Sequence, residues 1–419
     1  MRCPAWQIVA FMPILFLALC CPAVPAGSEE PKALVLAEAG QAWAVIVVAR
    51  DAPGEVRRGA SELQQYVEQI SDVRLAMIAP DNVASHREKV RIHVGVNASI
   101  PGPLPDLARC EKDGAWIRAI SGRDLLIAGK TPYGTEFGVY GFLQRFCGVR
   151  WFLPGPEGTH VPKAPSLRIP LPIDRLDNPV FISRSYSAPT FRDRLDYPCP
   201  QAQLMDLAWY RHNRMRKHFW CHHNLGHIIV PSKYGTEHPE FFPEIGGERR
   251  VPVSDRPVGF QPCMTNKSVI RLCAEAAAEH FTTTPDALSF SIGINDHGGF
   301  CECETCRTVN GPPRLNSRGL PDFSRLLFSF GNHVAASLPE RFRDRYVGLL
   351  AYAQARDLPR DMDIHPNLLV GRVTAFVSYF NPADRADMAM TRRMAEKCNM
   401  FGVYDYWYGR GYAVPHFGI

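Results

Sequence analysis

The stretch "ALSFSIGINDHGGFCECETC", residues 287–306, joins an apolar run, a polar pair and three cysteines. The run 287–294 is short and contains branched and aromatic residues, which is typical of a buried strand. Asn295 and Asp296 follow it directly, so they are expected at a strand end. Because parallel α/β sheets and barrels carry their functional groups at such ends, the stretch predicts both an α/β fold and a site.

The same strand signal recurs through the second half of the chain at the spacing of βα units. Seven strands are predicted, at residues 181–186, 216–220, 259–264, 287–294, 346–353, 367–374 and 400–407. Helical patterns lie between several of them, from 266 onward and at 321–338 and 383–398. This alternation predicts a parallel sheet. Since the number of strands approaches eight, we expect a TIM-type (β/α)₈ barrel over 180–419 that lacks its last βα unit.

Residues 30–170 predict a separate, small α/β domain. Strands are expected at 42–48, 90–96, 115–121, 124–130 and 148–155. One helix face is formed by residues at i, i+4, i+7, i+11 and i+14, namely Val56, Ala60, Leu63, Val67 and Ile70. A second helix is expected to begin at Pro132 with Thr131 as its N-cap. The proline-rich segment 161–180 is interpreted as a semi-rigid linker between the two domains.

The N-terminus predicts export. Residues 1–26 combine Arg2, an apolar run over 8–19 and small residues before Gly27, the pattern of a signal peptide. We therefore expect a periplasmic, cell-surface or secreted protein, with lipidation at Cys20 as an alternative. No second long apolar run occurs, so no transmembrane segment is expected in the mature chain. A net charge of +5 with interspersed signs argues against a nucleic-acid partner.

Several cysteines lie close in the sequence to Asn295 and Asp296. Four of them, Cys263, Cys301, Cys303 and Cys306, are expected at neighbouring strand ends, where they would pin the loop in place. Disulfides are the favoured form in an exported chain, and structural zinc bound by four thiolates is the alternative. No catalytic metal or other cofactor is expected. The histidine-rich segment 211–231 lacks a clear set of paired zinc ligands, and His227 is interpreted as a substrate contact.

Several stretches carry a family resemblance. "HPEFF" (238–242), "QPCMTN" (261–266), "SIGINDHGGFCECETC" (291–306) and "VYDYWYG" (403–409) resemble the bacterial domain-of-unknown-function family DUF4838. The segment 131–162 is similar to the end of the domain that precedes the barrel in bacterial hexosaminidases and α-glucuronidases. The resemblance implies a hexosaminidase/α-glucuronidase-like N-terminal domain, a glycosidase-like barrel and a carbohydrate substrate.

Glycosidases of this kind use two acidic groups beside the scissile bond. Asp296 is the candidate general acid or the group that orients one, and Asp405, among aromatic residues, is the candidate nucleophile or base. Either side chain could instead cap a turn. Substrate contacts are expected from five side chains: Asn295, His227, Tyr406, Glu240 and Tyr352. Three arginines, Arg184, Arg211 and Arg214, are candidates for pairing with a sugar carboxylate.

These observations predict an exported glycoside hydrolase-like enzyme acting on a complex polysaccharide that contains uronic acid or amino sugars. The alternative is a non-catalytic carbohydrate-binding protein or a degenerate barrel. Two carboxyl groups about 5 to 9.5 Å apart across one pocket would favour hydrolysis, whereas a lone Asp296 would favour binding. We expect Asp296 and Asp405 to face the same pocket.

Overall fold

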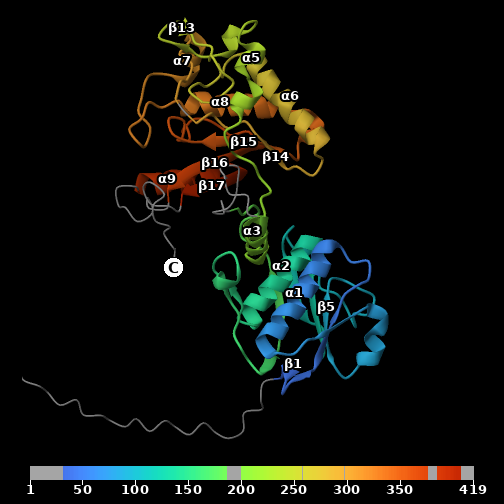
Figure 1. Cartoon of the computed structure of the whole chain (residues 1–419). Coiled ribbons are helices and arrows are strands. Elements are labelled where there is room, and N and C mark those ends of the chain that lie inside the picture. The colour runs from blue at the N-terminus through green and yellow to red at the C-terminus, as the bar shows by residue number, and fades with distance from the viewer. Residues whose placement is uncertain (1–31, 186–199, 257, 297, 376–384, 407–419) are drawn as a thin grey trace, which may run out of the picture. The chain divides into compact units, whose positions relative to one another are not determined.

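The structure, a computed structural model, describes residues 32–185, 200–256, 258–296, 298–375 and 385–406. The chain divides into two units, residues 1–179 and 180–419, which are coloured from blue to green and from green to red in Figure 1. The expected signal peptide lies outside the described residues. None of the helices in the described ranges combines the length and apolarity needed to span a bilayer.

The first unit is built on a mixed sheet in the strand order β11-β6-β7-β5-β3-β4. Its strands are β3 (Ala44–Val47), β4 (Ala76–Ile78), β5 (Val90–Val94), β6 (Ala115–Ala119), β7 (Asp124–Gly129) and β11 (Asp174–Asp177). Strands β3, β4, β5 and β7 run parallel, whereas β6 and β11 are antiparallel to their neighbours. Four of these strands coincide with predicted ones, whereas the fifth predicted strand, 148–155, contains only the two-residue β8 (Arg150–Trp151), which pairs outside this sheet.

Two long helices, α1 (Gly54–Ser71) and α2 (Pro132–Phe146), lie side by side on this sheet (Figure 1). The apolar face predicted for the first helix is buried throughout. Thr131 caps α2 as predicted, because its Oγ1 accepts a hydrogen bond from the Gly134 amide at 3.0 Å. Gly138 permits close packing of α2 on the sheet, since a Cβ there would lie 2.6 Å from the Ala115 Cβ.

The proline-rich segment is part of the first unit, and its interpretation as a linker was wrong. It contains β10 (Ser166–Pro170), which pairs with β1 (Ala33–Glu38), and β11, which pairs with β6. Both are edge strands, where proline is tolerated because one side of the strand needs no ladder bonds. The remaining short elements of this unit are β2 (Gln41–Ala42), β8 (Arg150–Trp151), β9 (Thr159–His160), η1 (Pro80–His86), η2 (Leu107–Arg109) and η3 (Pro156–Gly158).

The second unit contains a parallel sheet in the order β14-β15-β16-β17. The strands are β14 (Ser289–Ser291), β15 (Tyr346–Ala351), β16 (Leu368–Ala375) and β17 (Met400–Tyr406), which match the last four predicted strands. The described parts of 181–186, 216–220 and 259–264 form no ladder strands. The sheet topology of the described chain therefore shows a mixed α/β unit and not the expected seven-stranded barrel. The loss of a last βα unit stays a prediction.

The segment 216–223 explains this difference physically. It runs along β14, but hydroxyl groups replace the backbone ladder: the Trp220 and His222 amides donate to the Oγ atoms of Ser289 and Ser291 at 2.7 and 2.9 Å. The segment also lies directly on β15, since a Cβ at Gly348 would be 2.1 Å from the Trp220 carbonyl oxygen. The strand-like composition of 216–220 thus reflects a close neighbour of the sheet and not a member of it.

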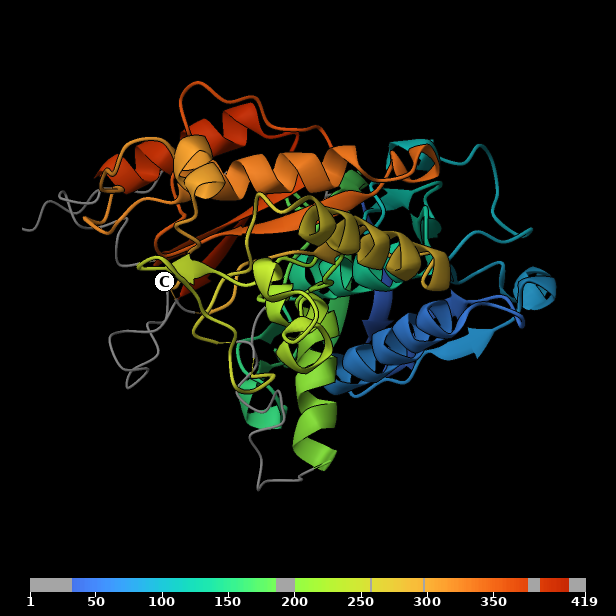
Figure 2. The same ribbon diagram turned by 90° about the horizontal axis from the view of Figure 1, so that it is seen from above.

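Helices α6 (Lys267–Thr283), α8 (Ser324–Ala336) and α9 (Arg385–Lys397) pack against this sheet, and Figure 2 shows α8 and α9 along its strands. All three were predicted to within a few residues. The unit further contains α3 (Pro200–His212), α4 (Leu225–Ile228), α5 (Pro231–Tyr234), α7 (Glu304–Asn310), η4 (Pro239–Phe241), η5 (Glu340–Phe342), β12 (Glu244–Ile245) and β13 (Glu248–Arg249).

Candidate functional site

The Asp296 site consists of Asp296, Tyr352 and His223. Asp296 follows β14, and its side chain is 61% exposed. The hydroxyl of Tyr352, at the end of β15, donates to the Asp296 Oδ1 at 3.2 Å. His223, just before α4, brings its Nε2 to 3.9 Å from the same oxygen. Three segments that are distant in sequence thus present polar atoms around one accessible carboxylate.

The orientation of His223 is fixed from two sides. Its Nδ1 hydrogen-bonds with the Ile294 carbonyl oxygen, which requires a proton on that nitrogen. Its ring packs edge-on against Tyr352, with the ring centroids 5.5 Å apart. The neutral ring therefore presents an unprotonated Nε2 towards Asp296, and only the imidazolium forms an ion pair with it.

Asn295 does not contact substrate in this arrangement, contrary to the expectation. Its side chain has 0% exposure; its Oδ1 accepts from the Gly226 amide at 2.7 Å and its Nδ2 donates to the Phe260 carbonyl at 2.8 Å. The Gln261 side chain binds both backbone polar groups of Asn295 at 3.0 Å. Asn295 is therefore a brace between three segments, and it positions the neighbouring Asp296.

Asp405 is placed by the register of β17 on β16. It pairs with Thr374, so the two side chains share one face of the sheet. Arg372, two residues before Thr374, lies on that face as well, and its Nε donates to Thr391 of α9 at 3.1 Å. Asp405 is half-buried and therefore lies on the face that carries α9.

Tyr352 lies on the other face. Ala351 pairs with Arg372 and so shares the face of α9, and the next residue, Tyr352, points the opposite way because side chains alternate along a strand. Asp296, held by Tyr352, belongs to this second face. The register gives no support for a pocket shared by Asp296 and Asp405, and that pocket stays a prediction.

The remaining expected substrate contacts are His227, Glu240 and Tyr406. His227 is exposed on α4. Glu240 lies in η4 with its carboxylate 3.2 Å from His238 Nδ1. Tyr406 ends β17, and its side chain is outside the described residues. Their contact with substrate stays a prediction. His223 was not predicted, because the sequence does not distinguish it from the other histidines of the segment 211–231.

Of the three arginines considered for binding a sugar carboxylate, Arg184 is bound to backbone carbonyl groups. The Arg184 guanidinium donates to the Arg214 carbonyl oxygen at 2.9 and 2.7 Å from Nε and Nη2, and to the backbone of Phe181. These bonds hold the start of the second unit to the turn after α3. Arg184 therefore has a structural role here and not the sugar-binding role that was considered.

The four cysteines form one cluster, which we call the thiol centre: Cys263, Cys301, Cys303 and Cys306. All four are buried and their sulfurs lie within 4.8 Å of one another. Cys263 Sγ is 3.9 Å from that of Cys303 and 3.7 Å from that of Cys306, whereas a disulfide requires about 2.05 Å. The prediction that at least two sulfurs lie at bonding or co-ligand distance is confirmed, and the structure has the thiols free and not as the favoured disulfides.

Hydrogen bonds from the Cys301 and Cys306 side chains lower the pKa of Cys263 within this centre. Elsewhere burial acts the other way and raises the pKa of Cys398 to about 11. Within the described ranges, the thiol centre is the one group of at least three histidine, cysteine or acidic side chains whose ligand atoms converge. It follows that any metal held by side chains of this kind in the described chain belongs here.

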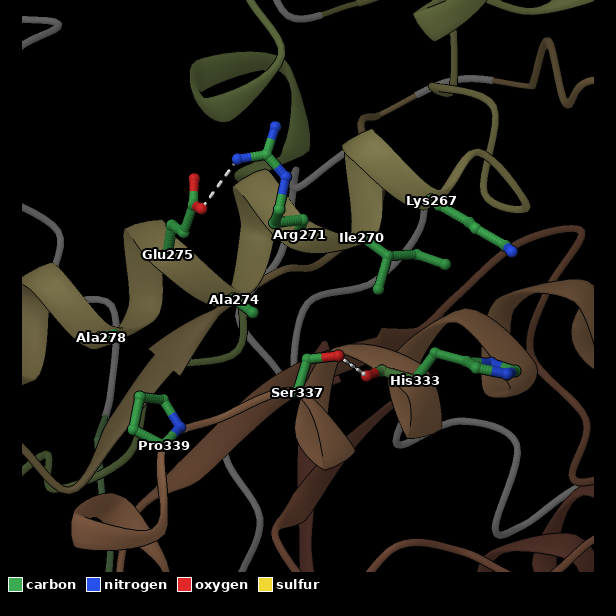
Figure 3. A pocket seen from close by; sticks show the side chains of 9 residues that line it. All are labelled: Lys267, Ile270, Arg271, Ala274, Glu275, Ala278, His333, Ser337 and Pro339. Atoms are coloured by element: carbon green, nitrogen blue, oxygen red, sulfur yellow. Dashed lines mark hydrogen bonds and ion pairs between the residues drawn. The ribbon is translucent and has the colours of Figure 1, made fainter.

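A separate groove lies between α6 and α8 and has a volume of about 560 Å³ (Figure 3). It is lined by Lys267, Ile270, Arg271, Ala274, Glu275, Ala278, His333, Ser337 and Pro339. Its one carboxylate, on Glu275, is paired with Arg271 at 2.9 Å. Because it contains none of the residues of the Asp296 site, we do not assign it to the same function.

The parallel strands and the helices packed on them define an α/β protein. The chain belongs to the family "Domain of unknown function (DUF4838)", whose model matches residues 153–415. A search of curated proteins finds no match.

A solved glycosidase shares the fold, and others are similar to this chain at lower scores. A family GH115 4-O-methyl-α-glucuronidase with specificity for decorated arabinogalactans is 12% identical, with a TM-score of 0.51, over 91% of this chain and 51% of that one. Flavobacterium johnsoniae chitobiase is 11% identical over 90% of this chain and 58% of that one, with a TM-score of 0.44. The Streptomyces coelicolor GH20 β-N-acetylhexosaminidase is 13% identical over 91% and 74%, with a TM-score of 0.41. The chain spans about half the length of the α-glucuronidase.

Proposed function

We propose that this chain is an exported glycoside hydrolase-like protein that acts on a complex polysaccharide containing uronic acid or amino sugars. The proposal rests on Asp296, an exposed carboxylate bound by the Tyr352 hydroxyl at the carboxyl end of a parallel strand. This end of parallel α/β folds is where ligands bind and react. The fold shared with an α-glucuronidase supports the same class of substrate.

Asp296 is the residue that we place at the glycosidic bond, with the Tyr352 hydroxyl bound to its carboxyl group and His223 beside it. Because Asp405 pairs with Thr374 on the face of α9, whereas Asp296 is exposed in the loop after β14, we infer that Asp296 acts without a second protein carboxylate from position 405. Hydrolysis with one protein acid is chemically complete when the sugar supplies its own nucleophile, the substrate-assisted route. This favours an amino sugar over a uronic acid at the cleaved bond.

In that route the acetamido oxygen of the sugar forms a bond to the anomeric carbon while the glycosidic bond breaks. Asp296 gives its proton to the leaving oxygen. Water then attacks the anomeric carbon, opens the cyclic intermediate and returns a proton to Asp296. The protein contributes position and one proton, both of which the Asp296 site can provide.

A second candidate function is carbohydrate binding without cleavage. It is favoured by the placement of Asp405, because most glycosidases need a pair of carboxyl groups about 5 to 9.5 Å apart. In this case Asp296, Tyr352 and His223 would supply hydrogen bonds to sugar hydroxyl groups and no proton transfer.

The test is a panel of polysaccharides and oligosaccharides that carry N-acetylhexosamine, uronic acid or neither, scored for released reducing ends and for binding. Asp296→Asn should lower turnover on the active substrate by about a hundredfold or more, with little change in binding. Asp286→Asn is the control, because Asp286 is exposed near the other end of β14. Binding without release of reducing ends would favour the second candidate. The proposal would be overturned if the protein neither bound nor cleaved any member of the panel.

A further inference from the structure

We propose that the thiol centre binds a structural zinc ion through Cys263, Cys301, Cys303 and Cys306. This inference is independent of the proposed function, since it concerns how the loop after Asp296 is held and not what Asp296 does. It begins from the convergence of the four buried sulfurs from two separate segments of the chain.

The sulfur spacing fits a metal and not a disulfide. Zinc binds thiolates at about 2.3 Å in tetrahedral geometry, so neighbouring sulfurs in such a site lie about 3.8 Å apart. The two measured separations from the Cys263 sulfur are 3.9 Å to Cys303 and 3.7 Å to Cys306. All four sulfurs lie within 4.8 Å of one another, which leaves each of them able to reach one central ion.

The chemistry of the ligand set selects the ion. Four thiolates are soft ligands that favour zinc over calcium or magnesium, which take oxygen ligands. A full set of four protein ligands also leaves no coordination position for water or substrate, so the site is structural and not catalytic. The C-x-C-x-x-C order of residues 301–306 supplies three ligands from a short stretch that runs from the loop into α7, and Cys263 supplies the fourth from a distant segment.

Groups around the centre are arranged to support thiolates. The Glu244 amide and the Arg249 Nη1 lie 3.3 and 3.6 Å from the Cys301 sulfur. The Thr265 hydroxyl lies 3.1 Å from the Cys306 sulfur. Such outer contacts orient metal ligands, and the positive charge of Arg249 offsets the net negative charge of a zinc tetrathiolate.

The ion would tie together three segments that have little regular structure of their own. Cys263 is bound through its amide to the Phe241 carbonyl at 2.8 Å, and the Glu302 amide is bound to the Glu244 carbonyl at 2.7 Å. The loop 298–306, the segment around Cys263 and the β12–β13 hairpin therefore meet at the thiol centre. Because this loop begins beside Asp296, the ion would also limit the movement of that carboxylate.

The experiment is metal analysis of the full-length protein, purified with a reductant and without chelator. We expect one zinc ion per chain in the wild type, loss of that zinc in Cys306→Ala, and its retention in Cys273→Ala. Cys273 is a matched control because it is a fully buried cysteine in the neighbouring helix α6 and no member of the centre. Wild-type protein without bound metal, or equal zinc in Cys306→Ala and wild type, would overturn the proposal.

Two measurements on the wild type do not depend on the folding of a variant. Replacement of the metal by Co²⁺ should give the thiolate charge-transfer and d–d absorption of a tetrahedral tetrathiolate site, and its absence would count against the assignment. Peptide mapping without reductant should find all four cysteines as thiols after the metal is removed. A disulfide between any two of them in freshly purified protein would show that the centre is a cross-link and refute the zinc site.

Discussion

A buried ion network in the second unit should contribute strongly to its stability. Asp387, near the start of α9, accepts hydrogen bonds at Oδ1 from Arg372 of β16 and from Arg356, the latter at 2.8 Å. All three side chains are at least nine-tenths buried. Arg372 also donates to the Arg356 carbonyl at 2.7 Å, so the network holds the loop that follows Tyr352.

Replacement of Asp387 by Asn keeps the size of the side chain and removes its charge. The change leaves two buried guanidinium groups facing an amide that accepts at one atom only. Removal of one partner from a buried charge network costs about 3–5 kcal/mol, because the remaining charges are left uncompensated. We expect Asp387→Asn to lower the free energy of unfolding by this amount at neutral pH.

The loss should depend on pH in a defined direction. Burial favours the protonated acid, but Arg372 and Arg356 outweigh it and lower the pKa of Asp387. A depressed pKa gives a stabilisation that is complete above the unfolded value, about 3.9 for Asp, and is lost as the pH falls through the lower folded value. The difference between wild type and variant should therefore be constant near neutrality and shrink below about pH 4.

The assay is urea unfolding followed by circular dichroism from pH 7 downward, with hydrogen exchange of the peptides that cover β15 and the following loop. Asp361→Asn is the control: Asp361 is 70% exposed and pairs with Arg325 at the surface, where an ion pair contributes little to stability because solvent screens it. A loss for Asp387→Asn no larger than that of the control, or one that is unchanged by acid, would refute the reasoning.

Two smaller perturbations test the local packing. Gly348→Ala should destabilise the second unit by about 1–3 kcal/mol in chemical denaturation, because the new Cβ would lie 2.1 Å from the Trp220 carbonyl oxygen. Gly402→Ala, in the same sheet with open space at the Cβ position, should not show this loss; equal effects would contradict the packing argument. Thr131→Ala should cost about 1 kcal/mol by removing the cap of α2, and unchanged stability would show that the cap contributes nothing.

Helices and strands that bury an apolar face were predictable from the sequence. The first helix of the chain was found from its spacing alone, because burial of one face requires apolar residues three to four positions apart. The last four strands of the second unit were found for a related reason: strands between packed helices are apolar on both faces.

Segments whose backbone amides donate hydrogen bonds to side chains were not predictable in the same way. Residues 216–223 have the composition of a strand, but the hydroxyl groups of Ser289 and Ser291 take the place of a neighbouring strand. Composition reports which side chains are buried, and it does not report which atoms accept the backbone hydrogen bonds. This is why the predicted strand 216–220 is absent from the described sheet.

The two neighbours Asn295 and Asp296 show what decides a role at a strand end. The buried position must accept a hydrogen bond from the Gly226 amide and donate one to the Phe260 carbonyl. An amide side chain does both, whereas an ionised carboxylate only accepts and would also be a buried charge. The exposed position has no such requirement, and there a carboxylate remains accessible beside the Tyr352 hydroxyl. The order Asn then Asp therefore places the buried bracing amide inside and the accessible carboxylate outside, a difference in environment that their adjacency in the sequence does not reveal.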